Sequence, residues 1–305
     1  MTTPAQRVAH LSFSADGRRA AYAALNDTAT VYRAGFDPAT ERLTGEPMPV
    51  TTGTRVWGGL HASADGEWLA AHSTQQQEDI YIFRSDGSSI RQLTDDAFND
   101  RLPRWAPDGS RLAFYSNRSV RYEIWTIRPD GSDLRQITRA KNDLLYPVWS
   151  NDSTRLAAVD VEARRAFVFS ANSAPSEQQP EELPVLTDRP AAFETWSWSP
   201  DGEQILGRVR GPTFAIYAYS FRTRQYTRIA ADLASGIGPL WLNDSRRVLT
   251  NWTENLVLID RARGTRDIFN VRPDVLTGLA VSQDNRKLFF IRSSRQADIW
   301  MLTIN

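Results

Sequence analysis

Short apolar runs alternate with polar or turn residues along this chain, and they do not follow the three-to-four spacing of a helix. The clearest stretch contains the runs 101–105, 111–116, 123–127 and 134–138, separated by Pro-Asp-Gly-Ser, a polar loop and a second Pro-Asp-Gly. Glycine reaches positive φ without a steric clash, and aspartate bonds to nearby backbone N–H groups, so Asp-Gly favours a tight turn. The stretch therefore predicts four strands of an antiparallel meander.

The Asp-centred turn recurs along the whole chain. Complete copies are Ser-Ala-Asp-Gly at 14–17 and 63–66, Ala-Pro-Asp-Gly at 106–109 and Ser-Pro-Asp-Gly at 199–202, and degenerate copies begin at 150, 242 and 282. Positions three residues before and four residues after each aspartate are apolar in all seven copies, so the strands repeat together with the turn. The anchors, which we assign a structural role in the turns, are Asp16, Asp65, Asp108, Asp152, Asp201, Asp244 and Asp284.

The spacing of the anchors predicts the fold. Successive anchors are 49, 43, 44, 49, 43 and 40 residues apart, and four-stranded repeats of about 40–45 residues are typical of β-propellers. We therefore predict an all-β fold with one domain over 1–305, a seven-bladed β-propeller of four-stranded antiparallel blades, with six blades as the less favoured count. The approximate blades are 8–52, 57–95, 101–139, 144–188, 194–231, 236–272 and 276–305.

The last unit ends after its third strand. We expect the N-terminus to close this blade, with residues 1–7 as the candidate strand, or the blade to remain three-stranded. Only a stub of closing strand precedes Phe13, so a full outer strand would require residues upstream of Met1. The aromatic residue before each turn, such as Trp105 or Trp149, is expected to pack between blades because aromatic side chains dominate cores.

Two runs in the third unit carry a family resemblance. WAPDGSRLAFYSNRS at 105–119 and EIWTIRPDGSDLRQIT at 123–138 resemble the WD40-like (PD40) repeat of TolB-type propellers. The match is strongest in units two, three and five, and its register covers about residues 8–305. The resemblance implies a propeller but no single activity, because similar propellers look like periplasmic scaffolds, sensor domains or gating domains of prolyl-oligopeptidase-like peptidases.

Composition excludes several classes of function. Lys plus Arg and Asp plus Glu are both 36, so no net positive charge favours nucleic acid or an anionic membrane. The chain has no cysteine, which excludes disulfides and thiolate metal ligands. No apolar run approaches the roughly 18 residues of a membrane span, so we expect no membrane insertion. The compartment stays open: extracytoplasmic if a leader or upstream domain was removed, cytoplasmic if Met1 is native.

Catalytic motifs are missing from the sequence. The three histidines, His10, His61 and His72, stand in different contexts, and neither Gly-x-Ser-x-Gly, a Walker loop nor Gly-x-Gly-x-x-Gly occurs. Metal sites need several convergent ligands, and a serine-hydrolase elbow needs its own motif. We therefore expect no catalytic residues, no cofactor and no resident metal, while a divalent cation at the channel mouth remains an alternative.

The face around the channel mouth is the candidate binding surface. Loops that enter the inner strands and loops that join second and third strands lie on the same side of a propeller. The first set is rich in carboxylates and the second in arginine. Aromatic residues together with arginine are typical interface anchors, although solvated turns or packing between blades would also explain these residues. The candidate contact residues are Arg55, Trp57, Asp100, Arg101, Asp143, Tyr146, Glu194 and Trp196.

These observations predict a non-catalytic, monomeric scaffold or sensor propeller that binds a protein or peptide on the loop face. The alternative is a propeller hydrolase or lyase, or the gating propeller of a peptidase whose catalytic domain is absent.

Overall fold

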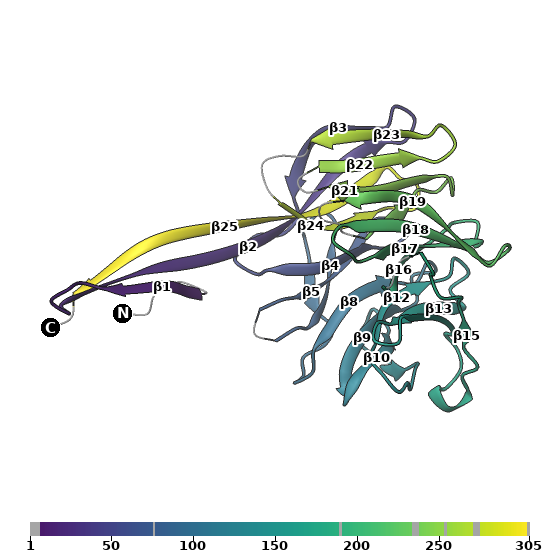
Figure 1. Ribbon diagram of the computed structural model, residues 1–305, viewed down its shortest axis with the longest axis horizontal. Coiled ribbons are helices and arrows are strands. Elements are labelled where there is room, and N and C mark those ends of the chain that lie inside the picture. Colours follow the sequence, from purple (N-terminus) through teal and green to yellow (C-terminus); the bar gives the residue numbers. More distant parts are fainter. Residues whose placement is uncertain are drawn as a thin grey trace.

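The computed structural model describes residues 7–75, 77–188, 191–233, 238–252, 255–270 and 275–303. The described residues form β-strands and one short 3₁₀ turn, η1 (Pro175–Glu177). Figure 1 shows a ring of sheets and a long arm that projects from it.

Five four-stranded antiparallel sheets follow one another along the chain. In each, consecutive strands pair as neighbours, as the alternating runs predict. Their strands are β4 (Trp57–Ala62), β5 (Trp68–Ser73), β6 (Ile80–Arg84) and β7 (Ile90–Gln92); β8 (Asp100–Trp105), β9 (Leu112–Ser119), β10 (Arg121–Ile127) and β11 (Arg135–Gln136); β12 (Leu144–Trp149), β13 (Arg155–Asp160), β14 (Arg165–Ser170) and β15 (Glu181–Glu182); β16 (Phe193–Trp198), β17 (Gln204–Val209), β18 (Phe214–Ser220) and β19 (Gln225–Leu233); and β20 (Leu240–Trp241), β21 (Arg247–Trp252), β22 (Asn255–Asp260) and β23 (Thr265–Asn270).

A sixth sheet joins the two ends of the chain. Its order is β24 (Val275–Val281), β25 (Lys287–Thr303), β2 (Arg19–Asp37) and β3 (Arg42–Pro49), with β1 (Arg7–Phe13) also paired to β2. The predicted closure of the last blade by the N-terminus is therefore confirmed, but β2 and β3 supply the closing strands. Residues 1–6 of the expected closing segment lie outside the described residues.

The described strands group into six sheets around the ring, which is the count that the sequence favoured less. The predicted units 8–52 and 276–305 do not form separate blades, because both contribute strands to one shared sheet: β1, β2 and β3 from the first unit, and β24 and β25 from the last. The physical cause is that β2 and β25 run straight through the positions where a hairpin was expected, and they pair with each other from Arg19 to Gly35 and from Lys287 to Thr303. The all-β propeller of four-stranded antiparallel blades is confirmed.

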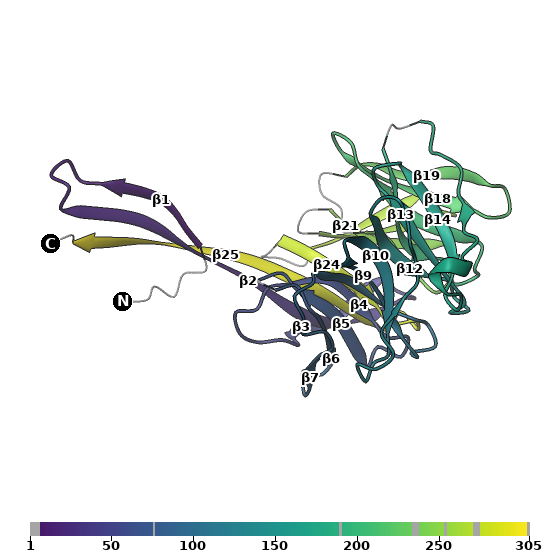
Figure 2. The same cartoon turned by 90° about the horizontal axis from the view of Figure 1, so that it is seen from below.

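Beyond the ring, β1, β2 and β25 continue as a three-stranded arm (Figure 1; Figure 2). Phe13, expected to pack between blades, lies on this arm and is 62% exposed. The other aromatic residues at its repeat position are buried as predicted, because neighbouring sheets cover them: Trp105, Trp149, Trp198 and Trp241.

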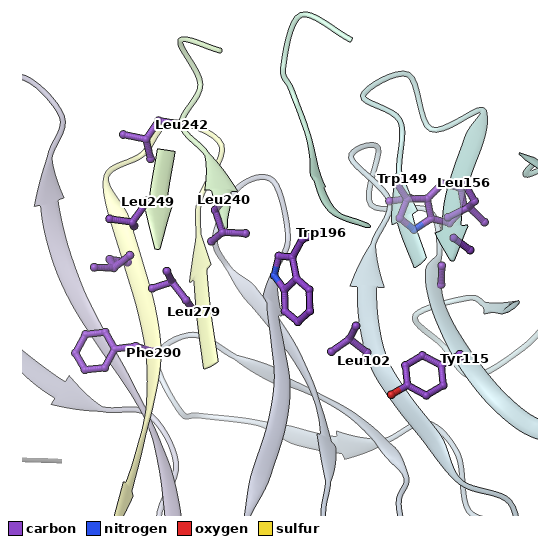
Figure 3. Close-up of a cluster of buried hydrophobic side chains, with 14 of the residues drawn as sticks. Leu102, Tyr115, Trp149, Leu156, Trp196, Leu240, Leu242, Leu249, Leu279 and Phe290 are labelled. Carbon is purple, nitrogen blue, oxygen red and sulfur yellow. The ribbon is translucent and has the colours of Figure 1, made fainter. Parts of the chain in front are cut away.

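Apolar side chains fill the wedges between neighbouring blades. Ile82 of one sheet packs with Leu112 and Phe114 of the next, and backbone contacts reinforce the packing: the Trp149 Nε1–H donates to the Arg104 carbonyl at 3.0 Å. A larger cluster connects wedges across the ring through Trp196, which lies between Leu240 and Leu102 in Figure 3.

The anchor aspartates form the predicted turns. In all seven turns, the aspartate Oδ1 accepts the backbone N–H two residues later, at 2.9–3.1 Å. The residue after the aspartate has positive φ, from 52° to 78°, and is glycine in the four complete copies. Ser153, Ser245 and Asn285 adopt the same conformation in the degenerate copies. The anchors are thus explained by turn structure.

Candidate functional site

A β-bulge interrupts the inner strand of five sheets and changes which side chains face the channel. The registers shift between Gly58 and His61, Arg101 and Arg104, Leu145 and Val148, Thr195 and Ser197, and Leu276 and Gly278. Leu102 and Tyr146, at the bulges of β8 and β12, have φ of 55° and 57°, a conformation that bulky side chains rarely adopt.

Three of the predicted contact residues come together at the mouth of the channel. The ring centroids of Tyr146 and Trp196 are 5.8 Å apart. Glu194 is buried and accepts hydrogen bonds from Arg208 and Arg210. The Arg210 Nη2–H also donates to the Tyr146 hydroxyl at 3.1 Å. We call these five residues the mouth cluster.

Trp196 lies inside the core. Its indole packs with Leu102 and Leu240 (Figure 3) and is 8% exposed. It also lies against the backbone at Gly238, where an added Cβ would be 1.6 Å from the indole Cδ2. Only glycine leaves room for this ring.

The interpretation of Trp57 and Trp196 as accessible anchors is therefore wrong, because packing within and between blades buries both indoles. Trp57 packs on Tyr81 and Phe83, with ring centroids 5.3 and 5.5 Å apart. Arg55 is exposed and its guanidinium lies 4.3 Å from the Tyr81 ring centroid, at a separate cavity of about 650 Å³.

The remaining predicted residues make contacts within the protein. Asp100 is fully buried and pairs with Arg118, which also contacts Asp96 at 2.7 Å. Burial raises the pKa of Asp100, against the hydrogen bonds that favour its charged form. Arg101 pairs with Glu78, and its guanidinium lies 5.4 Å from the Tyr122 ring centroid. Asp143 is exposed and accepts the Tyr122 backbone N–H at 3.0 Å.

Sequence reasoning missed Arg104, which is 2% exposed within β8. Its Nη1–H approaches the Leu60 carbonyl at 3.4 Å, whereas its Nε and Nη2 have no hydrogen-bond partner among the described residues. The guanidinium lies 4.9 Å from the Trp196 ring centroid. Burial lowers the pKa of Arg104 to about 9.

A signal for Arg104 is present in the repeat. Four residues before the anchor, the other units that contribute an inner strand to the ring carry neutral residues, and unit three carries the arginine. The neutral residues are His61, Val148, Ser197, Leu240 and Ala280. A guanidinium at such a position costs free energy on burial unless a partner compensates it.

The half-buried His61 and the buried His72 add no charge at neutral pH. Burial lowers the pKa of His61 and of His72 to about 3. The His61 Nδ1 accepts the Trp105 backbone N–H at 3.1 Å, and the His72 Nδ1 accepts that of Leu102 at 3.4 Å. Within the described part of the chain, no three histidine, aspartate or glutamate side chains lie close enough to hold a metal ion.

A cavity of about 160 Å³ lies at the opposite end of the channel, beside the Asp turns. Sequence reasoning considered only the loop face and did not find it. The residue immediately before the anchor in each of six turns lines it: Ala64, Pro107, Asn151, Pro200, Asn243 and Gln283. Hydrogen bonds join five of these residues to neighbouring turns; for example, the Asn151 amide donates to the Pro200 carbonyl at 2.8 Å, and the Gln283 backbone N–H donates to the Ala64 carbonyl at 2.9 Å.

The ring of antiparallel sheets around a channel defines a β-propeller, and comparisons with known proteins agree. No protein-family model matches the chain. A curated relative, the uncharacterized protein Atu1656 of Agrobacterium fabrum, is 30% identical over 106 residues, which are 34% of each chain. In this match, the chain spans about a third of the length of the curated relative.

Solved structures show the fold more fully. A protein assigned as TolB from Agrobacterium tumefaciens is similar over 88% of this chain and 99% of its own, with a TM-score of 0.67 and 15% identity. TolB from Acinetobacter baumannii is similar over 95% of this chain and 79% of its own, with a TM-score of 0.58 and 14% identity. A chain of the nidogen/laminin complex is similar over 87% of this chain and 98% of its own, with a TM-score of 0.62 and 10% identity. The fold is thus that of TolB-type β-propellers. None of the described residues form a helix that could span a bilayer.

Proposed function

We propose that the protein is a non-catalytic binding module that holds a protein or peptide at the mouth of the propeller channel, and that this ligand contributes a carboxylate. The observation that carries the proposal is the buried Arg104, whose Nε and Nη2 lack partners among the described residues. A charge in a low-dielectric channel acts over a longer distance than a charge in water, so Arg104 favours anionic groups at the mouth.

The mouth cluster offers the contact groups that such a ligand needs. The side chain of Arg210 is 54% exposed, although it also bonds Glu194 and Tyr146. Arginine binds carboxylates through two parallel N–H donors, and tyrosine adds apolar area and a hydroxyl. An acidic side chain could thus reach Arg210 and Tyr146 while Arg104 acts from beneath them. The similar fold in the nidogen/laminin complex is consistent with a propeller that binds a protein.

A peptide titration tests this function. Two fluorescently labelled peptides of equal length would be used, one of alternating Asp and Tyr and the other with Asn in place of every Asp. We expect fluorescence anisotropy to show binding of the Asp peptide that weakens in high salt and weakens at least about tenfold in Arg210→Gln, the loss of roughly one charge-assisted hydrogen bond.

Arg224→Gln is the matched control. Arg224 is 60% exposed in the turn before β19, and it pairs with Glu181 of the outer strand β15, away from the mouth cluster. Its substitution should leave the affinity unchanged. Equal binding of the Asn peptide, or an equal loss in Arg224→Gln, would contradict the proposed role of the mouth.

A further inference from the structure

The arm has the architecture of a propeller blade. Its strands β1 and β2 pair in the register of the two inner strands of a regular blade, and three features are shared with β8 and β9: the pair that flanks the turn, the position of the bulge, and a residue of positive φ six positions before the anchor. The pair that flanks the turn is Phe13–Ala20 in the arm and Trp105–Leu112 in the third blade. The bulge lies between Ala9 and Ser12 in the arm and between Arg101 and Arg104 in the blade. The residue of positive φ is His10 in the arm and Leu102 in the blade.

The end of β25 takes the place of the third strand. Leu302 lies opposite Ala20 in the arm, as Ile127 lies opposite Leu112 in the third blade and Phe83 opposite Leu69 in the second. The arm is therefore the inner three strands of a seventh blade, assembled from both ends of the chain and held outside the ring.

The third strand of the arm lacks the covering that the third strand of a ring blade receives. In the second blade, the third-strand residues Ile80, Tyr81, Ile82 and Phe83 are 0%, 7%, 1% and 1% exposed. The matching arm residues Ile299, Trp300, Met301 and Leu302 are 82%, 44%, 73% and 46% exposed. Side chains alternate between the two faces of a strand, so Ile299 and Met301 lie on one face of the arm and Trp300 and Leu302 on the other. We call these four residues, together with the exposed Leu11 and Phe13, the arm patch. Large apolar side chains gathered in the open on one element are typical of an interaction site.

We propose that the arm patch binds the arm of a second copy of this chain, and so forms a two-fold dimer. Blade faces of this repeat bind other blade faces of the same repeat, as every wedge of the ring shows. Among the described residues, all six blades of one copy already have neighbours in the ring. A second copy supplies an identical uncovered blade, and a two-fold axis makes one patch complementary to itself.

The unpaired strand edge of the arm also favours a second copy of the chain as the partner. β24 pairs with β25 only as far as Ser293, and the described residues 294–303 of β25 pair with β2 on one side alone. An unpaired strand edge offers backbone N–H and C=O groups to another strand. The second arm can therefore add hydrogen bonds to the apolar contact. This dimer differs from the monomer that the sequence analysis expected.

Sedimentation velocity of the full chain, from about 1 to about 100 µM, tests the dimer. The wild type should sediment as a dimer at the upper concentrations. Ile299→Asp/Met301→Asp should raise the dissociation constant at least about 100-fold, because it places charges in the apolar contact. Val120→Asp/Ile268→Asp is the control, since both residues are exposed apolar residues of ring blades, and it should dimerise like the wild type. A wild type that stays monomeric, or an arm variant that still dimerises, would overturn the proposal.

A second variant distinguishes this dimer from a rearranged ring. If β2 and β25 instead fold back as hairpins at 26–29 and 293–296, the strands of the arm separate. The Thr28 and Ser294 hydroxyl oxygens are 2.8 Å apart across the arm, and the chain has no native cysteine. Thr28→Cys/Ser294→Cys should therefore form an intrachain disulfide on oxidation and remain dimeric. Failure to crosslink, or a crosslinked protein that is monomeric, would overturn the proposal.

Discussion

Replacing Arg104 with methionine should stabilise the fold. Methionine keeps an unbranched apolar stem of similar length, and it removes a buried charge whose Nε and Nη2 have no partner among the described residues. Burial lowers the pKa of Arg104 from 12.5 to about 9. At about 1.4 kcal/mol per pKa unit, the folded state holds this charge at a cost of up to roughly 5 kcal/mol.

Two smaller effects reduce the expected gain. The substitution removes the cation–π contact with Trp196, at 4.9 Å, which contributes about 1–2 kcal/mol. Methionine also fits the guanidinium site imperfectly, at a cost of about 1 kcal/mol. The net expectation is a stabilisation of roughly 1–3 kcal/mol, within the range seen when buried charges are replaced by apolar residues.

Urea unfolding at pH 7, followed by tryptophan fluorescence, measures this change. Arg118→Met is the matched control, because Arg118 is also buried but pairs with Asp96 and with the fully buried Asp100. Removing Arg118 leaves a buried carboxylate unpaired and should destabilise the fold by about 3–5 kcal/mol. A lower urea midpoint for Arg104→Met than for the wild type would refute the reasoning, because it would show that the guanidinium is stabilised in place.

Three further predictions follow from burial. Gly238→Ala should destabilise the fold by about 1–3 kcal/mol or more, because its Cβ meets the Trp196 indole; unchanged thermal unfolding would contradict this contact. His61 and His72 each have a pKa of about 3 in the folded state, against 6.5 in the unfolded state. The unfolded state therefore binds more protons, and the free energy of unfolding should fall by about 1.4 kcal/mol per pH unit for each histidine as the pH drops below 6.5. A smaller pH dependence in His61→Gln, measured by urea midpoints, checks this. Burial and nearby carboxylates raise the pKa of Asp79 to about 6, so its folded form binds the proton more tightly and stability falls as the pH rises from 4 to 6; Asp79→Asn should gain stability relative to the wild type over that window, and parallel pH curves would count against it.

The sequence by itself determined the repeating parts of this protein. The strands of the third unit, the turns around Asp108 and its equivalents, and the burial of Trp105 follow from local signals: alternation, turn residues and an aromatic position in register. Such signals act within a few residues, so each blade is readable without its neighbours. The repeat also placed Tyr146 and Glu194 on inner strands, where the structure has them; their role in binding stays a prediction.

Only the tertiary structure decided the number of blades and the state of Arg104. Asn26 and Asp27 suit a turn, yet this segment and 293–296 continue as strands because they pair with each other across the two ends of the chain. The partners of a side chain are likewise set by other blades: Arg104 is visible in the sequence, but its burial against Trp196 of β16 depends on packing around the ring. Pairing and burial between distant segments are long-range properties, and a local pattern does not contain them.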